Sequence, residues 1–174
     1  MIFIKDNLKN YLKPIEKELL VDVEKYKHLR DINFSVETKH KNLIYNTFIN
    51  ICKERLNNFT LINTDFKLWC FYTEKSWVDG GRVIEEKSTK IPFHNHLYTT
   101  TINSVLYLKS PKGCGLDIEY ENKTEFLEMK DYDIIIFPNW LNHRPVISNT
   151  KSRISFNLEL RCKEDVNDIF KDYK

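Results

Sequence analysis

Apolar residues at helical spacing mark two segments in the first third of the chain. One stripe follows Pro14, a residue that fits the first turn of a helix, and it consists of Ile15, Leu19, Val23 and Tyr26. The other lies between about His40 and Asn57 and consists of Ile44, Phe48, Cys52 and Leu56. Polar and charged residues separate these positions, so the pattern predicts two amphipathic helices. We expect their apolar faces to pack on the chain's own sheet rather than on a partner.

Short runs rich in β-branched and aromatic residues alternate with turn residues in the remainder of the chain. The predicted strands are Phe66–Thr73, Arg82–Glu86, Thr99–Leu108, Leu116–Tyr120, Glu125–Met129, Asp133–Phe137, Arg144–Ile147 and Arg153–Arg161. The turn Glu121-Asn122-Lys123 indicates a hairpin between the fourth and fifth of these strands. Helices followed by short strands predict a mainly β sandwich or closed jelly roll with helices on its outside. We expect one domain over residues 1–174, with a helical support region at 1–60 and a jelly-roll core at 66–162.

The composition is that of a globular domain and excludes several function classes. Hydrophobic residues make up 41% and charged residues 30% of the 174 residues, and the net charge of +2 is too small to indicate binding to nucleic acid. No apolar run approaches the roughly 20 residues of a membrane span, and the N-terminus lacks the pattern of a signal peptide. The four scattered cysteines form no CxxC pair. We therefore expect reduced thiols and a cytoplasmic location, whereas the oligomeric state is not indicated.

Three histidines have the spacing of a metal site. His94 and His96 are separated by one residue, so an extended segment places both side chains on the same side. His143 follows an apolar strand and could come from a neighbouring strand. Imidazole suits Fe(II) and Zn(II). HxH alone recurs by chance, and His28 and His40 lie in charged surroundings typical of surface histidines, so the prediction rests on the three residues together.

The last predicted strand has one apolar and one polar face. The polar face consists of Arg153, Ser155, Asn157 and Glu159. Two interpretations are open: the apolar face lies in the core and the polar face in water, or the apolar face packs outward and the polar face lines a cavity. In the second case Arg153 needs an anion, since burial of an unpaired charge is costly. A guanidinium group fits a carboxylate, and Ser155 could add a hydrogen bond.

The order of these motifs resembles that of the Fe(II)/2-oxoglutarate-dependent dioxygenases, in particular their short, often phage-encoded members. The resemblance covers about Trp69 to Leu160 and is sharpest in Phe137-Pro138-Asn139-Trp140-Leu141-Asn142-His143 and Arg153-Ile154-Ser155. It implies a double-stranded β-helix, the jelly roll of cupin-like barrels, in which His94 and His143 bind Fe(II). It also implies that Arg153, with Ser155 and Tyr107, binds the distal carboxylate of 2-oxoglutarate. The activity implied is hydroxylation with O2, coupled to decarboxylation of 2-oxoglutarate to succinate and CO2.

His96 departs from this pattern, because the family has Asp or Glu at the second position of the motif. Two explanations are open. His96 is a ligand and the site has three histidines, as in some related cupin barrels, or His96 is not a ligand and an acid such as Asp117 or Glu119 takes its place. A three-histidine site carries one negative charge less beside the metal ion than a site with two histidines and a carboxylate.

Two other functions and the substrate stay open at this point. A cupin-like metalloenzyme that does not use 2-oxoglutarate is one alternative, although Leu97–Ile102 lacks the usual cupin glutamate. A non-catalytic jelly roll that acts as a binding module is the other. The substrate could be a small molecule, a peptide or a protein, and we expect Asn157 and Trp140 to contact it. The polar segment Trp77–Lys90 could be a lid over the site or an ordinary loop.

Overall fold

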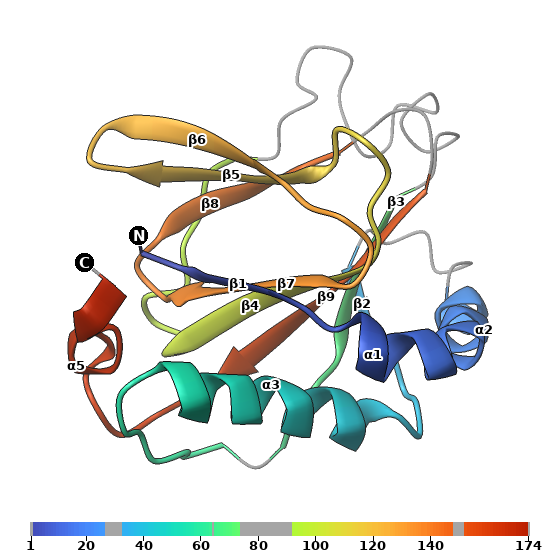
Figure 1. The fold of residues 1–174 in the computed structure, drawn as a ribbon, viewed down its shortest axis with the longest axis horizontal. Coiled ribbons are helices and arrows are strands. Elements are labelled where there is room, and N and C mark those ends of the chain that lie inside the picture. Colours follow the sequence, from blue (N-terminus) through green and yellow to red (C-terminus); the bar gives the residue numbers. More distant parts are fainter. Residues whose placement is uncertain (1, 27–32, 64, 74–91, 148–151, 174) are drawn as a thin grey trace.

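Two antiparallel β-sheets lie face to face in the molecule (Figure 1). The computed structural model describes residues 2–26, 33–63, 65–73, 92–147 and 152–173. The six-stranded sheet has the order β1-β7-β4-β9-β3-β2, with the bounds Ile4–Asn7, Asp133–Pro138, Ile102–Lys109, Arg153–Leu160, Trp69–Thr73 and Asn33–Ser35. The three-stranded sheet has the order β6-β5-β8, with the bounds Lys123–Glu128, Gly115–Tyr120 and Asn142–Val146. This arrangement confirms the predicted jelly roll.

Helices cover the face of the larger sheet that is turned away from the smaller one (Figure 1). Their bounds are Lys9–Leu12 for α1, Lys13–Ile15 for the 3-10 turn η1, Glu16–Tyr26 for α2 and Lys41–Arg55 for α3. Near the C-terminus, α5 spans Val166–Ile169 and the 3-10 turn η3 spans Lys171–Tyr173. α2 and α3 confirm the two predicted amphipathic helices. Within the described ranges, no helix is both long and apolar enough to cross a membrane.

The predicted helical region 1–60 also contributes two strands, which the sequence pattern did not reveal. Ile4 of β1 pairs with Ile136 of β7, and Phe34 of β2 pairs with Cys70 of β3. Both strands are short, and their ladder partners lie far away in the sequence, so local pattern carries little signal for them. The predicted strand Arg82–Glu86 and the segment Trp77–Lys90, for which a lid and an ordinary loop were both open, lie outside the described residues.

The hairpin formed by β5 and β6 matches its prediction and has a tight turn. Tyr120 pairs with Lys123, and the two residues between them, Glu121 and Asn122, have positive φ angles of 51° and 62°. Two consecutive positive φ angles match the right-handed twist of the flanking strands. At the other end of the hairpin, a Cβ atom on Gly115 would meet the carbonyl oxygen of Leu127 at 2.0 Å, so no larger residue fits this position.

Two hydrophobic cores lie on opposite faces of the six-stranded sheet, and they fix the orientation of β9. The outer core packs Phe156 and Leu158 of β9 against α2 and α3 residues such as Leu19 and Phe48. The inner core lies between the sheets and includes Val105. The apolar face of β9 therefore packs outward on the helices, and its polar face is turned inward toward the second sheet. This resolves the two interpretations left open by the alternation along the strand.

The carboxylate of Glu16 joins the start of α2 to the six-stranded sheet. Its Oε1 accepts a hydrogen bond from Lys109 at the end of β4 and, at 2.6 Å, another from the hydroxyl group of Tyr132. Its Oε2 accepts one from Lys13 at 2.8 Å. Burial by itself raises the pKa of Glu16, but these three hydrogen bonds outweigh it and lower the pKa to about 2.

We expect the substitution Glu16→Gln to lower the free energy of unfolding by about 1–3 kcal/mol at pH 7. Because the pKa is lower in the folded than in the unfolded chain, the wild-type advantage is present above pH 4.5 and is lost as the pH falls toward 2. Urea unfolding of both proteins between pH 7 and pH 3 measures this difference. Glu54→Gln, at an exposed position of α3, serves as the control. A wild-type advantage that stays constant over this pH range would contradict the expectation.

Candidate metal centre and adjoining cavity

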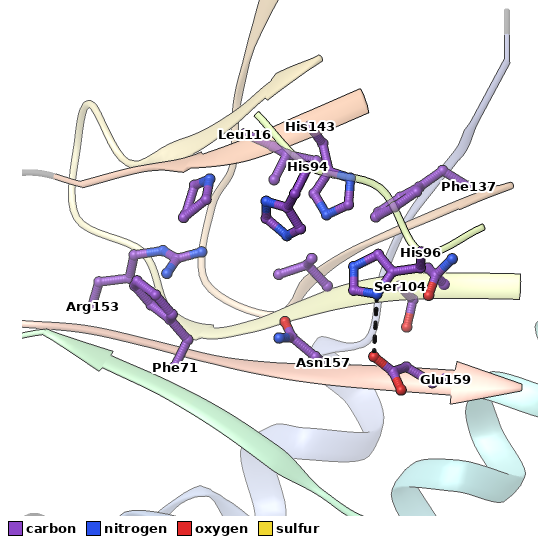
Figure 2. Close-up of a pocket in the computed structure, with 13 residues that line it drawn as sticks. Phe71, His94, His96, Ser104, Leu116, Phe137, His143, Arg153, Asn157 and Glu159 are labelled. Atoms are coloured by element: carbon purple, nitrogen blue, oxygen red, sulfur yellow. Dashed lines mark ion pairs between the residues drawn. The ribbon is translucent and has the colours of Figure 1, made fainter. Parts of the chain in front are cut away.

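Three histidine side chains converge at one end of the space between the sheets (Figure 2). His143 lies on β8, while His94 and His96 lie in the segment that precedes β4. One ring nitrogen of each lies within 4.8 Å of the corresponding nitrogens of the other two. The ring centroids of His94 and His143 are 4.4 Å apart, and those of His96 and His143 are 5.2 Å apart. Three imidazole nitrogens at this separation can bind one transition-metal ion.

The Nδ1 atom of each ring lies near an oxygen atom. Nδ1 of His143 lies 3.0 Å, and Nδ1 of His94 lies 3.3 Å, from the backbone carbonyl oxygen two residues earlier in the chain. Nδ1 of His96 lies 3.7 Å from Oε1 of Glu159. Acceptors at Nδ1 favour the tautomer that is protonated there and leave the Nε2 lone pairs for a metal ion. Such outer oxygen contacts are typical of metal-binding histidines.

The surroundings keep two of the three imidazoles neutral. Burial, together with the nearby His94 and His96 rings, lowers the pKa of His143 to about 3. Burial and the neighbouring His94 lower the pKa of His96 to about 4. Both side chains are therefore unprotonated at neutral pH, and their lone pairs are available to a metal ion without release of a proton.

Backbone hydrogen bonds hold the HxH segment against β8 and the turn before it. His94 and His143 form a β-bridge in which each amide donates to the other's carbonyl oxygen, at 3.0 and 2.9 Å. The amide of His96 donates to the carbonyl oxygen of Asn139 at 2.8 Å. The side chain of Asn139 donates in turn to the carbonyl oxygen of Thr100 at 2.7 Å. Asn139, in the Phe-Pro-Asn part of the motif, thus holds the turn that begins at His96.

The two acids proposed as replacements for His96 have other partners. Asp117 forms a partly buried ion pair with Arg144, with contacts of 2.8 and 2.9 Å. Glu119 accepts a hydrogen bond from Asn142 at 3.3 Å. Their neighbours on β5, Leu116 and Ile118, belong to the inner core. Because side chains alternate across a strand, both acids point away from the histidines. The three-histidine arrangement is the one that the geometry favours.

Arg153 lies near the other end of the space between the sheets and has no anionic partner among the described residues. Its side chain is 1% exposed, and its Nε and Nη1 atoms have no hydrogen-bond partner. The guanidinium carbon lies 4.6 Å from the ring centroid of Phe71 and 4.9 Å from that of Tyr107. Stacking on aromatic rings stabilises a cation. It does not replace the hydrogen bonds that a buried guanidinium group requires, so these point to a missing anion.

Three further buried hydroxyl groups around Arg153 have no hydrogen-bond partner within the described part of the chain, namely those of Thr73, Tyr107 and Ser155. Thr73 pairs with Arg153 across β3 and β9, and Tyr107 pairs with Ser155 across β4 and β9. All of these side chains lie on the inner face of the sheet. Burial raises the pKa of Tyr107, so its hydroxyl group remains a donor at neutral pH. A guanidinium group and three hydroxyl donors without partners match the several acceptor lone pairs of a carboxylate.

A cavity of about 110 Å³ connects the histidines with Arg153. Figure 2 shows Arg153 and Phe71 at one end, His96 and Glu159 at the other, and Asn157 between them. A water molecule needs only about 10–15 Å³ of such space, so the cavity has room for a small organic molecule. The charge of Arg153 and the three imidazoles thus face the same enclosed volume.

Trp140 is not among the residues that line this cavity, so its contact with a substrate stays a prediction from the sequence. Its ring lies 6.0 Å from that of Tyr120, beside a separate hollow that Ile2 also lines. Trp140 lies in the turn between β7 and β8, before β8 begins at Asn142, so strand alternation does not relate its direction to that of His143. Trp140 is thus close to His143 in the sequence but does not lie at the cavity.

Several residues at or beside the cavity were not predicted as site residues, among them Phe71, Thr73, Asn103 and Glu159. Phe71 and Thr73 lie on β3 and were recognised only as members of a strand. Asn103, whose Nδ2 atom has no partner, lines the cavity from β4. The period of two along β9 placed Asn157 on a definite face, but the contribution of β3 depends on its register with β9, which no local pattern reveals.

No family model and no curated protein matches the sequence. Solved structures with a similar fold include a prolyl-4-hydroxylase from Pseudomonas putida, with 11% identity, 93% of each chain covered and a TM-score of 0.57. Another is a prolyl hydroxylase from Trichoplax adhaerens in complex with a hypoxia inducible factor peptide, with 14% identity, 98% of this chain and 84% of that chain covered and a TM-score of 0.58. A third is a viral collagen prolyl hydroxylase from Paramecium Bursaria Chlorella virus-1, with 13% identity, 94% and 91% coverage and a TM-score of 0.56. The chain thus has the double-stranded β-helix fold of these prolyl hydroxylases.

Proposed function

We propose that the protein is an Fe(II)- and 2-oxoglutarate-dependent oxygenase that hydroxylates a small molecule or a peptide. The observation that carries this proposal is Arg153, which is buried without an anionic partner among the described residues and lines the same cavity as the three histidines. A metal site alone has no use for a buried cation. A cosubstrate that binds the metal ion at one end and presents a carboxylate at the other accounts for both ends of the cavity.

The side chains have distinct roles in this proposal. His94, His96 and His143 hold Fe(II), and Arg153, with Ser155 and Tyr107, holds the distal carboxylate of 2-oxoglutarate. Thr73 adds a donor at this end. When bound, Fe(II) supplies the activation of O2 that is coupled to decarboxylation of 2-oxoglutarate to succinate and CO2.

The remaining task of the protein is to position the reactants and to exclude water. Phe71 and Val105 provide apolar wall between the two polar ends of the cavity. Asn157 lies between these ends, and we assign it to the binding of substrate or of the part of the cosubstrate nearer the metal ion (Figure 2). One neighbour in the fold comparison is a prolyl hydroxylase in complex with a peptide, which makes peptides that contain proline the first substrates to test.

Anaerobic addition of Fe(II) and 2-oxoglutarate to the purified protein tests the binding step. We expect a weak metal-to-ligand charge-transfer band in the visible range that appears only when both are present. Succinate release in air, measured with peptides that contain proline and with small-molecule candidates, then tests the reaction. A protein that binds stoichiometric Fe(II) without this band is a metalloenzyme of another kind, and one that binds no metal is a non-catalytic module. Either result contradicts the proposal.

A further inference from the structure

The carboxylate of Glu159 lies directly behind the residue that departs from the family motif. Glu159 projects from β9 on the same face as Arg153 and Asn157, and its Oε1 lies 3.7 Å from Nδ1 of His96 (Figure 2). Its side chain is one-third exposed, whereas that of His96 is 23% exposed. Glu159 and His96 are 63 positions apart in the chain, and the carboxylate approaches the imidazole ring at its Nδ1 atom.

The three histidines differ in what they face at Nδ1. For His94 and His143 it is a neutral backbone carbonyl oxygen. His96 faces a carboxylate. A carboxylate behind a ligating imidazole orients the ring and makes it a more basic ligand, so part of the negative charge reaches the metal ion. Nδ1 and Oε1 are 3.7 Å apart, which is longer than a hydrogen bond, so the carboxylate acts on the neutral imidazole mainly through its negative charge.

The position of Glu159 gives a physical reason why position 96 holds a histidine rather than an acid. A carboxylate at position 96 would put two like charges side by side in a partly buried site, which is unfavourable. A neutral imidazole with an acid behind it avoids this repulsion and still leaves one negative charge next to the metal site. Position 96 and position 159 are therefore matched to each other.

We propose that Glu159 is a positioning residue that acts through His96 and supplies the negative charge which a carboxylate ligand would otherwise bring to the metal site. The inference rests on the proposed function, because it requires that the three histidines bind Fe(II). Glu159 itself does not touch the metal ion. Glu159 affects the metal site only through the ring of His96, so removal of this imidazole should also remove the effect of Glu159 on Fe(II) binding.

Fe(II) affinity, measured anaerobically by competition with a chelator, provides the first test. We expect Glu159→Gln to weaken Fe(II) binding about 10–100-fold. It should also raise the Fe(III)/Fe(II) reduction potential, because loss of a negative charge destabilises Fe(III) more than Fe(II). Glu125→Gln, at an exposed position of β6, is the matched control and should change neither value. Thermal unfolding of the metal-free variants shows whether the fold is intact.

A double-mutant cycle with His96→Ala, which removes the imidazole without placing a new charge beside Glu159, separates action through His96 from a structural role. In the H96A background we expect E159Q to change Fe(II) affinity by less than about threefold, because no imidazole remains for Glu159 to act on. An equal loss of affinity in both backgrounds, or an unchanged affinity and potential in E159Q alone, overturns the inference while the proposed function stands. Absence of stoichiometric Fe(II) in the wild-type protein overturns the proposed function itself.

Discussion

Replacement of His143 by alanine is expected to weaken Fe(II) binding by on the order of 1,000-fold, since loss of one of three ligands removes roughly a third of the binding free energy that such sites provide. His143 is the most buried of the three rings, and it lies on a strand of the barrel, so it contributes a fixed ligand around which the HxH segment is held. His40→Ala is the control, because His40 contacts Glu18 at 2.8 Å on the helical side of the molecule. Chelator competition and metal analysis after anaerobic loading measure the difference.

The substitution His94→Ala makes this test independent of folding. His143 is buried, and its replacement leaves a cavity that can lower stability. His94 is exposed, so its replacement perturbs the core much less. We expect loss of Fe(II) binding in both variants, with near-wild-type thermal unfolding in His94→Ala. Retention of one tightly bound Fe(II) per chain in both variants would show that these histidines are not ligands.

Replacement of Arg153 by methionine is expected to weaken 2-oxoglutarate binding about 100-fold or more while Fe(II) binding is retained. The loss follows from removal of one partner of a buried, charge-assisted contact. The same substitution should stabilise the ligand-free protein, by about 1–3 kcal/mol, because Arg153 is a buried cation without an anionic partner among the described residues. A substitution that weakens ligand binding but stabilises the ligand-free protein shows that the original residue serves binding rather than folding.

Titration of the anaerobic charge-transfer band with 2-oxoglutarate measures the affinity, and urea unfolding without ligand measures the stability. A wild-type protein with Fe(II) bound should also unfold at a higher temperature when 2-oxoglutarate is added, whereas Arg153→Met should not respond. Arg55→Met, at an exposed position of α3, controls for loss of a positive charge. Unchanged 2-oxoglutarate binding in Arg153→Met would remove the main support for this cosubstrate. Enzymatic activity that does not depend on Arg153 would favour the cupin-like alternative.

The two largest expected effects concern opposite ends of one cavity, which makes them informative as a pair. Loss of a histidine should abolish Fe(II) binding and, with it, the charge-transfer band. Loss of Arg153 should abolish the band at ordinary 2-oxoglutarate concentrations and leave Fe(II) in place. A protein in which both substitutions had the same effect on Fe(II) affinity would not have separate metal and carboxylate sites.

The cytoplasmic location and the relationship to phage-encoded members remain predictions from the sequence.

Much of the fold was predictable from local pattern. The apolar stripes predicted α2 and α3, and alternation with turn residues predicted most strands of both sheets. The spacing of His94, His96 and His143 predicted their convergence, because side chains two apart in an extended segment share one side and a jelly roll brings distant strands together. Alternation along β9 also grouped Arg153 with Ser155 and Asn157. These features follow from the periods of helix and strand, which are properties of the chain alone.

The tertiary structure decided what local pattern leaves open. Alternation assigns side chains to two faces of β9, but only packing against α2 and α3 determines which face is turned inward. Alternation assigns Asp117 to the face of β5 opposite to that of Leu116 and Ile118, but only the packing of these two residues in the inner core shows that Asp117 points away from the histidines. The contact between Glu159 and His96 likewise depends on how β9 lies relative to the HxH segment. Sequence thus determined which groups are available and on which face, whereas long-range packing and strand register determined which of them meet.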